Sequence, residues 1–342
     1  MKTYFGVDYH KKFSHGTIMN KKGIILKQGR FNNNKECIEK FLGDFMGNGC
    51  CSVLEATHNW MVVHDILEEL TVDVTLAHPL KVRAIAEAKI KTDKIDSTIL
   101  AHLLRCDLVP SAHVSSPKAR ITKNLLRHRM FLIRLQTTVK NRIHVLLDRH
   151  PRLRPQKPAN RFFTQIGIAE LKKIRLPKYD RSILYSEISL LEHLQAQIKQ
   201  TNEWLTGVGK KDKRIQWLLT IPGIGRTIAL LMVSEIDDIK RFRSDKKLHA
   251  YAGLIPSTHS SAGRTFHGRI IKTGNKYVRW AMIEAVWPAI RSDTSLDNYF
   301  QRFSFRKGVN RAKVCTARRS LTIVYKVLKE KREYRYVAQT RI

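Results

Sequence analysis

The sequence predicts a mixed α/β part followed by a mostly helical remainder, and three observations support this fold class. The first hundred residues alternate between short apolar runs typical of strands and longer runs with helical spacing. From about residue 117 to 205, apolar side chains recur at the intervals expected of long amphipathic helices. The last part contains apolar segments of helical length that are separated by glycine and proline turns.

The N-terminal part is expected to form a mixed sheet. The strand candidates are TYFGVDYH, FSHGTIMN, GIILKQGRF, CCSVLEAT and VDVTLA, and an NKKG turn between the second and third predicts a β-hairpin. Helices are expected at about 34–47, 60–70, 79–88 and 93–106. Three antiparallel strands, followed by alternating helices and strands, indicate a sheet with helices on its faces.

A helical arm is expected next. A long basic amphipathic helix should run from Pro117 to His150, and a second one should cover about 181–205. The apolar stripes are Ile121, Leu125, Leu132, Leu135, Val139, Ile143 and Leu146 in the first helix and Leu190, Leu191, Leu194, Ile198 and Leu205 in the second. The proline-marked stretch 151–178 separates them, which indicates an antiparallel, coiled-coil arm. We therefore predict three domains, at 1–112, 113–207 and 208–342.

The charge is far from ordinary, with 63 Lys and Arg against 29 Asp and Glu and a formal net charge of +34. Such an excess predicts a polyanionic partner, and nucleic acid is the first candidate. The longest apolar runs are too short to span a bilayer, so no membrane is expected. The N-terminus reaches the charge of Asp8 before a signal-peptide apolar region could form, and the five cysteines show no C-x-x-C pattern. We expect a cytoplasmic protein with reduced thiols.

Four acids fall at predicted strand ends or helix starts. Asp8 follows the strand YFGV, Glu55 follows CSVL, and Asp93 and Asp96 lie three residues apart where a helix begins. Converging carboxylates repel one another unless a proton or a cation neutralises them, and oxygen ligands suit Mg²⁺ or Mn²⁺. The alternative for each acid alone is structural, with Asp93 as a helix cap and Asp96 as a first-turn charge.

The segment LTIPGIGRTIALLMVSEI, residues 219–236, fits a helix–hairpin–helix. Gly223 and Gly225 allow a tight turn whose backbone N–H groups, together with Arg226, could bind a DNA phosphate without reading sequence. A structural turn between two core helices is the alternative.

A hydroxyl-rich loop follows, with Ser257, Thr258, Ser260 and Ser261 before Ala262 and Gly263. Basic residues that could bind phosphate come after it: Arg264, Arg269, Lys272 and Arg279. A nucleophilic serine needs deprotonation and a charge-stabilised phosphate nearby. The arginines could supply the second requirement, and His259 and His267 are close in sequence. Turn-forming serines are the structural alternative.

These segments together resemble the DEDD transposases of bacterial insertion sequences, the insertion sequence 110 family, which is similar to Piv-type DNA invertases. The matching motifs are FGVDYHKK, LEAT, KTDKIDS, IPGIGRTIA and AGLIPSTHSSAGR…IIKTGNKYVRWAM, in this order over nearly the whole chain. After LEAT the chain has His58-Asn59-Trp60, where many relatives have a glycine and then an aromatic residue.

The resemblance implies a RuvC-like RNase H fold with an Asp-Glu-Asp-Asp metal site at Asp8, Glu55, Asp93 and Asp96. It also implies a serine nucleophile in the C-terminal domain at Ser261, with Ser260 as its neighbouring alternative. Family members recombine double-stranded DNA at element ends and targets, as dimers or tetramers with composite active sites. Many are guided by a non-coding bridge RNA.

The expected function is therefore a transposase or site-specific DNA recombinase that cuts and rejoins DNA through a Mg²⁺-assisted phosphoserine intermediate. The alternative is a Holliday-junction-type nuclease, which would hydrolyse DNA with a metal-activated water and would need no serine.

Overall fold

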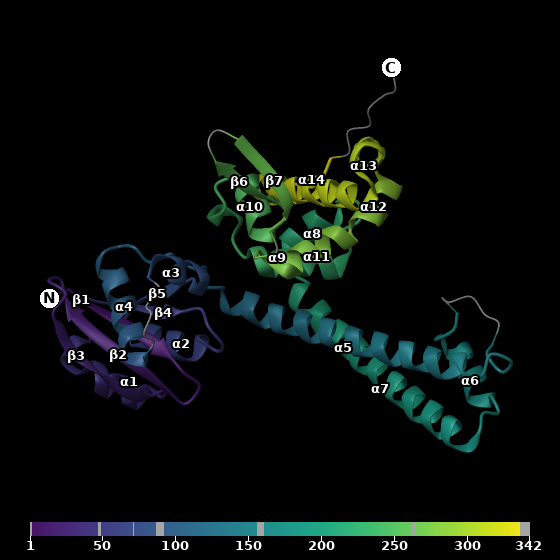
Figure 1. Cartoon of the computed structure of the whole chain (residues 1–342), viewed down its shortest axis with the longest axis horizontal. Helices are drawn as coiled ribbons and strands as arrows, with labels where there is room; N and C mark the ends of the chain where they lie inside the picture. The colour runs from purple at the N-terminus through teal and green to yellow at the C-terminus, as the bar shows by residue number, and fades with distance from the viewer. Residues whose placement is uncertain are drawn as a thin grey trace. The chain divides into compact units, whose positions relative to one another are not determined.

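The chain forms two compact units, residues 1–114 and 115–342 (Figure 1). The computed structural model describes residues 2–46, 49–70, 72–86, 92–155, 161–261, 264–271 and 273–335. A mixed α/β N-terminal unit and a mostly helical remainder are present, as the sequence predicts. The further division into three domains at residues 112 and 207 stays a prediction.

The first unit is built on a five-stranded sheet with the strand order β3-β2-β1-β4-β5. Its strands are β1 (Thr3–Tyr9), β2 (Phe13–Asn20), β3 (Ile25–Asn32), β4 (Cys50–Glu55) and β5 (Asp73–Ala77). The first three are antiparallel, whereas β4 and β5 run parallel to β1 and to each other. The predicted hairpin and mixed sheet are therefore confirmed.

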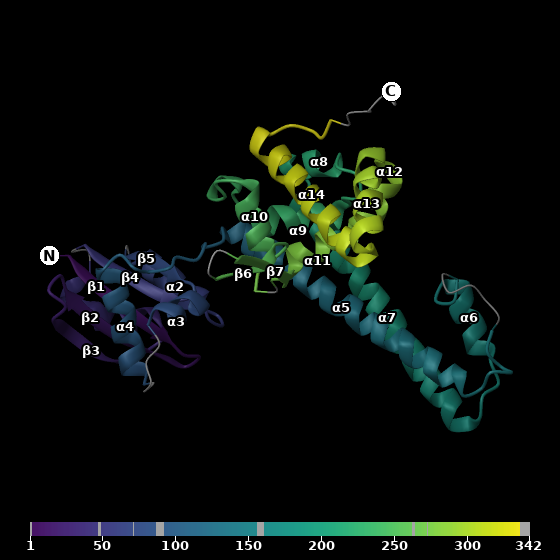
Figure 2. The same cartoon turned by 45° about the horizontal axis from the view of Figure 1, so that its top comes forward.

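Helices cover both faces of this sheet, and the alternation of side chains along β1 separates the two layers. The helices are α1 (Lys35–Leu42), α2 (Met61–Glu69), α3 (Pro79–Ile85) and α4 (Asp93–Arg105). Phe5 and Val7 are buried in the cluster that includes side chains of α1 and α2. Helix α4 lies across the strands of the sheet (Figure 2). Tyr4 packs with Ala101 of α4, so the even-numbered positions of β1 face this helix.

Glycine at position 6 lets α4 lie directly on β1. A Cβ at Gly6 would be only 2.1 Å from the Ser97 carbonyl oxygen and 2.5 Å from the Ala101 amide nitrogen. Any side chain there would push the helix away from the sheet. Asp8 is two residues further along the same face of β1, so this close approach brings it towards the first turn of α4.

The second unit contains the long helices α5 (Pro117–Asp148) and α7 (Lys178–Gly209), which pack along each other (Figure 1). Their contact buries apolar side chains such as Leu132, Ile143 and Leu191. Ile121 and Leu135, which the sequence placed on the apolar stripe, are exposed. The expected stripe was too wide there, because a pair of helices buries only a narrow seam. The proline-marked stretch also holds a helix that the sequence did not predict, α6 (Gln165–Lys173).

Helices around a third core form the rest of this unit, with a two-stranded hairpin. The helices are α8 (Lys213–Leu219), α9 (Arg226–Ile236), α10 (Asp245–Ala252), α11 (Lys276–Glu284), α12 (Val286–Ser292), α13 (Thr294–Lys307) and α14 (Val309–Glu330). The hairpin strands are β6 (Pro256–Ser261) and β7 (Arg264–Ile270). In the described ranges, no helix is long and apolar enough to cross a membrane.

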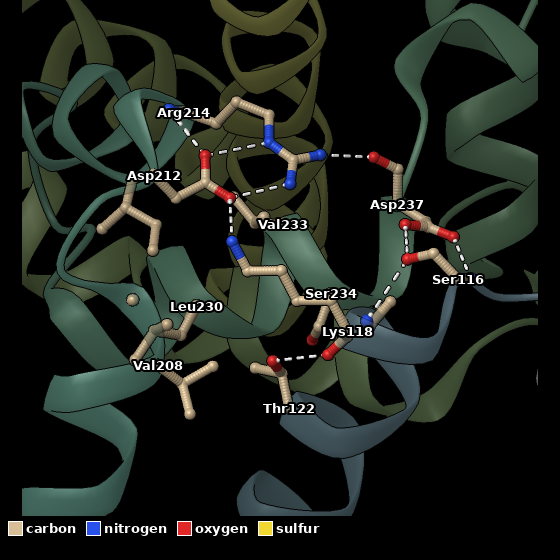
Figure 3. Close-up of a pocket in the computed structure, with 13 residues that line it drawn as sticks. Ser116, Lys118, Thr122, Val208, Asp212, Arg214, Leu230, Val233, Ser234 and Asp237 are labelled. Carbon is tan, nitrogen blue, oxygen red and sulfur yellow. Dashed lines mark hydrogen bonds and ion pairs between the residues drawn. The ribbon is translucent and has the colours of Figure 1, made fainter.

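Polar contacts fix the start of α5 to the C-terminal helices, around a small pocket (Figure 3). The Asp237 carboxylate accepts hydrogen bonds from the Ser116 amide and hydroxyl, both at 2.8 Å. Arg214 pairs with Asp212 at 2.7 Å and also donates to the Asp237 carbonyl oxygen. These bonds hold the beginning of the arm against α8 and α9.

Candidate catalytic site

Two of the predicted acids lie side by side at the ends of neighbouring parallel strands. Val7 of β1 is in register with Leu54 of β4, and Asp8 and Glu55 are the next residue of each strand. Residues in register on parallel strands point to the same face of a sheet. The carboxyl ends of β1 and β4 therefore present two acids to the face that α4 covers.

The other two acids are in the first turn of α4. Thr92 caps this helix, and its hydroxyl accepts a hydrogen bond from the Ile95 amide at 3.2 Å. The structural alternative for Asp93, a helix cap, is therefore wrong, because Thr92 has that position. Asp93 and Asp96 are separated by one helical turn, so they share a face.

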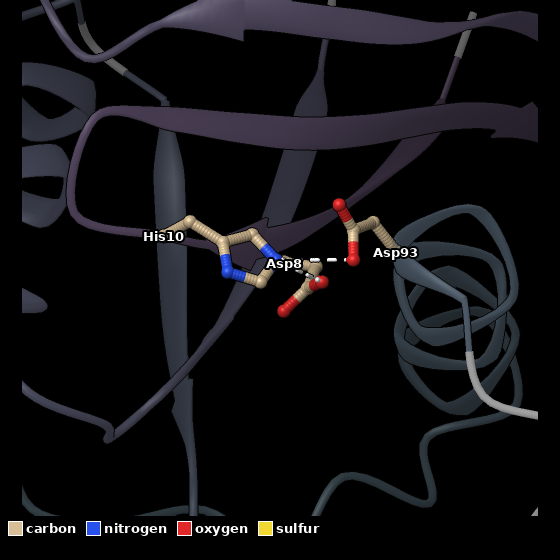
Figure 4. A group of neighbouring side chains, drawn as sticks. All are labelled: Asp8, His10 and Asp93. Carbon is tan, nitrogen blue, oxygen red and sulfur yellow. Dashed lines mark hydrogen bonds and ion pairs between the residues drawn. The ribbon is translucent and has the colours of Figure 1, made fainter.

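The structure joins Asp8 and Asp93 through a histidine that the sequence did not single out (Figure 4). His10 Nε2 lies 3.0 Å from Asp8 Oδ2 and 3.3 Å from Asp93 Oδ1. One ligand atom from each of Asp8, His10 and Asp93 lies within 4.8 Å of the others, which is the spacing of a candidate metal site. The pattern Asp-x-His on a strand could have revealed His10, because residues two apart share a face.

The electrostatics of this cluster centre on Asp8. Burial raises the pKa of the Asp8 carboxyl, pairing with His10 opposes the rise, and the Asp96 and Asp93 carboxylates add to it. Asp96 is therefore close enough to act on Asp8, although it is not one of the three clustered ligands Asp8, His10 and Asp93. Three carboxylates converge here, and Glu55 lies on the adjacent strand.

A second histidine ties the sheet to α4 beneath the acids. His15 pairs with Asp8 in the β1–β2 register, and its Nδ1 lies 2.9 Å from the Ser97 hydroxyl. Thr17 Oγ1 lies 2.8 Å from the same hydroxyl. Burial lowers the pKa of His15, whereas Asp93 and Asp8 oppose that effect. Neither His15 nor Ser97 carries a sequence signal, because their contact joins residues far apart in the chain.

The predicted serine loop is a β-hairpin in the second unit. Ser261 is the last residue of β6, is exposed and pairs with Arg264 of β7. The Ser260 hydroxyl lies 3.1 Å from the Thr265 hydroxyl, on the other face of the ribbon. The loop expectation was wrong because cross-strand pairing overrides the turn preference of serine. Residues 262 and 263 and the side chains of His259, Arg264 and His267 lie outside the described part.

The two glycines of the predicted helix–hairpin–helix have different surroundings. Gly223 has φ +80, and a Cβ there would lie 2.3 Å from the Ala285 carbonyl oxygen, so it faces the protein. A Cβ at Gly225 would meet nothing within 4 Å, and this residue precedes α9 at an exposed position. Arg226 is exposed as well. For Gly223, this geometry favours the structural alternative.

The basic residues that follow the serines in the sequence also differ in their surroundings. Arg269 is exposed on β7, and Lys272 lies outside the described residues. Arg279 is partly buried, and its Nη1 donates to the carbonyl oxygens of Ala252 at 3.1 Å and Gly274 at 3.4 Å. Arg279 therefore holds together the two chain segments at the base of the hairpin.

Two family models match this chain. A model for the DEDD transposases of the IS110 group, described as transposase, matches residues 5–151, which include the acidic cluster. A model described as the transposase IS116/IS110/IS902 family matches residues 215–301, which include the hairpin. The chain belongs to the IS110 family of transposases. It is a DNA transposase/recombinase, as the sequence predicts.

Individual relatives agree with this assignment. A transposase for insertion sequence element IS1111A from Coxiella burnetii is 24% identical over 290 residues, 83% of this chain and 79% of the relative. A transposase for IS1328 from Yersinia enterocolitica is 26% identical over 320 residues, 90% of this chain and 86% of the relative. A pilin gene-inverting protein from Moraxella bovis is 34% identical over 128 residues, 35% of this chain and 38% of the relative.

Proposed function

We propose that the transposase cuts and rejoins double-stranded DNA at element ends and target sites through a covalent intermediate on Ser261. In this proposal the first unit is a RuvC-like domain whose Asp8, Glu55, Asp93 and Asp96 hold Mg²⁺ or Mn²⁺. The observation that carries it is the meeting of Asp8 and Asp93 on one face of the sheet, bridged by His10.

The donor set fits a hard divalent cation. The predicted ligands are all carboxylates, which Mg²⁺ and Mn²⁺ prefer, and a His10 nitrogen is also within reach of two of them. Burial and the neighbouring acids raise the pKa of Asp8, so a positively charged partner would favour its carboxylate form. A bound divalent ion would stabilise charge on the oxygens of a DNA phosphate.

The protein's own contribution to strand cleavage is the Ser261 hydroxyl. It would lose its proton to a base and bond to phosphorus, while the bond from phosphorus to one sugar oxygen breaks. That oxygen leaves with a proton as a free DNA hydroxyl, and reversal of the step onto a new hydroxyl rejoins the strands. Its exposure at the end of β6 supports Ser261, whereas the Ser260 hydroxyl is already bonded to Thr265.

Nucleic acid would be held by exposed basic and backbone groups. Gly225, Arg226 and Arg269 are the predicted contacts that remain open to solvent. The net charge of +34 supports a large nucleic-acid partner, and we include a guiding bridge RNA beside the DNA. The serine and the acids belong to different units, which is compatible with composite sites in a dimer or tetramer.

Trapping of a covalent adduct tests the serine. With a nicked DNA substrate that prevents rejoining, the unmodified chain should form a protein–DNA adduct, and Ser261→Ala should form none. Ser260→Ala is the matched control and should retain the adduct. Cleavage by Ser261→Ala at the normal rate would instead identify a nuclease that uses a metal-activated water.

Titration with Mn²⁺ tests the acids separately. Asp93→Asn should weaken Mn²⁺ binding in calorimetry at least tenfold, because it removes a charged ligand. Asp73→Asn is the control, since Asp73 is an exposed acid at the opposite end of β5. Equal affinity in both variants would refute the metal site.

A further inference from the structure

The turn between α13 and α14 forms an exposed tip with an unusual surface. Seven consecutive residues, 305–311, are exposed, and Gly308 makes the turn at φ +78. Phe305, in the last turn of α13, is 95% exposed. A single exposed apolar side chain is ordinary, so the ring alone carries no argument.

The charge around this ring makes the tip distinctive. Arg302, Arg306, Lys307 and Arg311 surround the turn, and all four are exposed. Between Asp297 and Glu330 the chain has nine Lys or Arg and no Asp or Glu. In the part of the chain that the structure describes, none of the four has an acidic partner. A solvated helical hairpin normally mixes the two signs, so this surface is built for an anion.

The position of the Phe305 ring indicates which kind of anion this surface binds. Arg302 and Phe305 are three residues apart on α13, so a cation and an aromatic face lie on the same side of the helix. Cations that follow a phosphate backbone, combined with an aromatic ring that stacks on a base, are the features that bind unpaired nucleic acid. A paired duplex offers phosphates to the cations but hides the faces of its bases, except at ends and kinks.

We propose that the α13–α14 tip, residues 302–311, binds nucleic acid that contains an unpaired base, with the Phe305 ring stacked on that base. This surface deepens the proposed recombinase function, because strand exchange and pairing with a guide both expose unpaired bases. The unpaired strand is DNA or RNA, and both present the same phosphates and base faces. The cations set the affinity, and Phe305 selects unpaired over paired nucleotides.

A competing occupant is a second copy of the chain, because exposed rings also join protein subunits. The four cations argue against this, since two such tips would repel each other. If the tip joined two copies of the chain, the oligomeric state would depend on Phe305 and the affinity for nucleic acid would not depend on it.

Binding of labelled strands tests the proposal, measured by fluorescence anisotropy at one fixed salt concentration without divalent metal. The probes are a 20-nucleotide DNA, an RNA of the same sequence, and the hairpin-closed DNA duplex of that sequence. Phe305→Ala should weaken binding of the single strands by about 5- to 100-fold, the range for loss of one stacked base. It should change duplex binding by less than about twofold. If the loss of affinity is larger for the DNA strand, the bound strand is DNA, and if it is larger for the RNA strand, the bound strand is RNA.

Two variants complete the experiment. Phe305→Trp should restore single-strand affinity, and its indole fluorescence should be quenched by the single strands but not by the duplex. Tyr179→Ala is the matched control, because Tyr179 is also a highly exposed ring, 78% exposed, with Lys178 above it. This variant should bind all probes normally.

Three results would overturn the proposal. They are an unchanged single-strand affinity in Phe305→Ala, an equal loss for duplex and single strands, and a change of oligomeric state with unchanged affinity. Because the assay contains no metal and needs no cleavage, it gives the same answer whether or not Ser261 and the acids act as proposed.

Discussion

Replacement of Glu235 should loosen the hairpin that carries Ser261, although Glu235 lies in α9, outside the hairpin. Its side chain is 5% exposed, and its carboxylate lies 3.7 Å from Lys123 Nζ and 3.2 Å from Arg127 Nη2 of the arm. It also accepts a hydrogen bond at 2.9 Å from the amide of Asn275. Asn275 in turn donates its backbone amide to Tyr251 and caps α11, so Glu235 connects the arm to the base of the hairpin.

The magnitude follows from burial of the charges. Burial lowers the pKa of Lys123, and the Glu235 carboxylate opposes this effect, so Glu235 favours the charged form of Lys123. Removing one partner of a buried ion pair costs about 3–5 kcal/mol, and the 44% exposure of Arg127 reduces that figure here. We expect Glu235→Gln to lower the free energy of unfolding of the second unit by about 2–4 kcal/mol.

Urea denaturation and hydrogen exchange measure the two consequences. The unfolding midpoint of Glu235→Gln should fall, and the backbone amides of Ile271 and Asn275, at the hairpin base, should exchange faster. Glu187→Gln is the control, because Glu187 is a similarly buried carboxylate that pairs with Arg142 within the arm. It should lower stability without a selective change at the hairpin.

A double-mutant cycle separates the ion pair from simple loss of packing. Lys123→Met combined with Glu235→Gln should cost at least about 1 kcal/mol less than the two single changes added together. Additive costs, or equal hydrogen exchange at the hairpin base in the Glu235 and Glu187 variants, would refute the reasoning.

Three further predictions concern single positions. Gly6→Ala should lower the free energy of unfolding by about 1–3 kcal/mol and weaken Mn²⁺ binding, because α4 must move away from β1. Gly29→Ala adds no contact closer than 3.7 Å, so it should change neither quantity. Calorimetry measures both. Burial lowers the pKa of His249 from 6.5 to about 4. Roughly 3 kcal/mol of stability should therefore be present above pH 6.5 and lost as the pH falls to 4. Denaturation midpoints measured against pH should show this dependence, and His249→Gln should flatten it. Arg279→Ala should lower the melting temperature, whereas Arg269→Ala should weaken DNA binding and leave melting unchanged.

The sequence predicts those parts of the site that depend on local patterns. Asp8 and Glu55 follow apolar strands, and the strand pattern alone places both at carboxyl ends. The position of Asp93 is predicted by the helical pattern that begins at that residue. His10 and Ser97 act through contacts between a sheet and a helix that are separated by some eighty residues in the chain. No local signal marks Ser97, and the only local signal for His10 is its spacing of two residues from Asp8.

Backbone conformation limits prediction at other positions. Asn59 adopts φ +56 after the LEAT motif, a left-handed conformation that asparagine tolerates better than most side chains. This explains how the chain keeps a turn there without glycine. The β6–β7 hairpin escaped prediction for a different reason, since serine, histidine and threonine form strands only when a partner strand supplies the hydrogen bonds.

The distribution of acids in so basic a chain bears on what the acidic cluster is for. Several carboxylates that stabilise this fold pair with an arginine or lysine, as Glu235, Glu187 and Asp212 show. Within the described residues, Asp8 and Asp93 have no such partner and share only His10, although the chain contains 63 Lys and Arg. An arrangement selected for stability would have placed one of those cations between them. The convergence of uncompensated carboxylates therefore costs stability, and a bound divalent cation is the partner that would offset this cost.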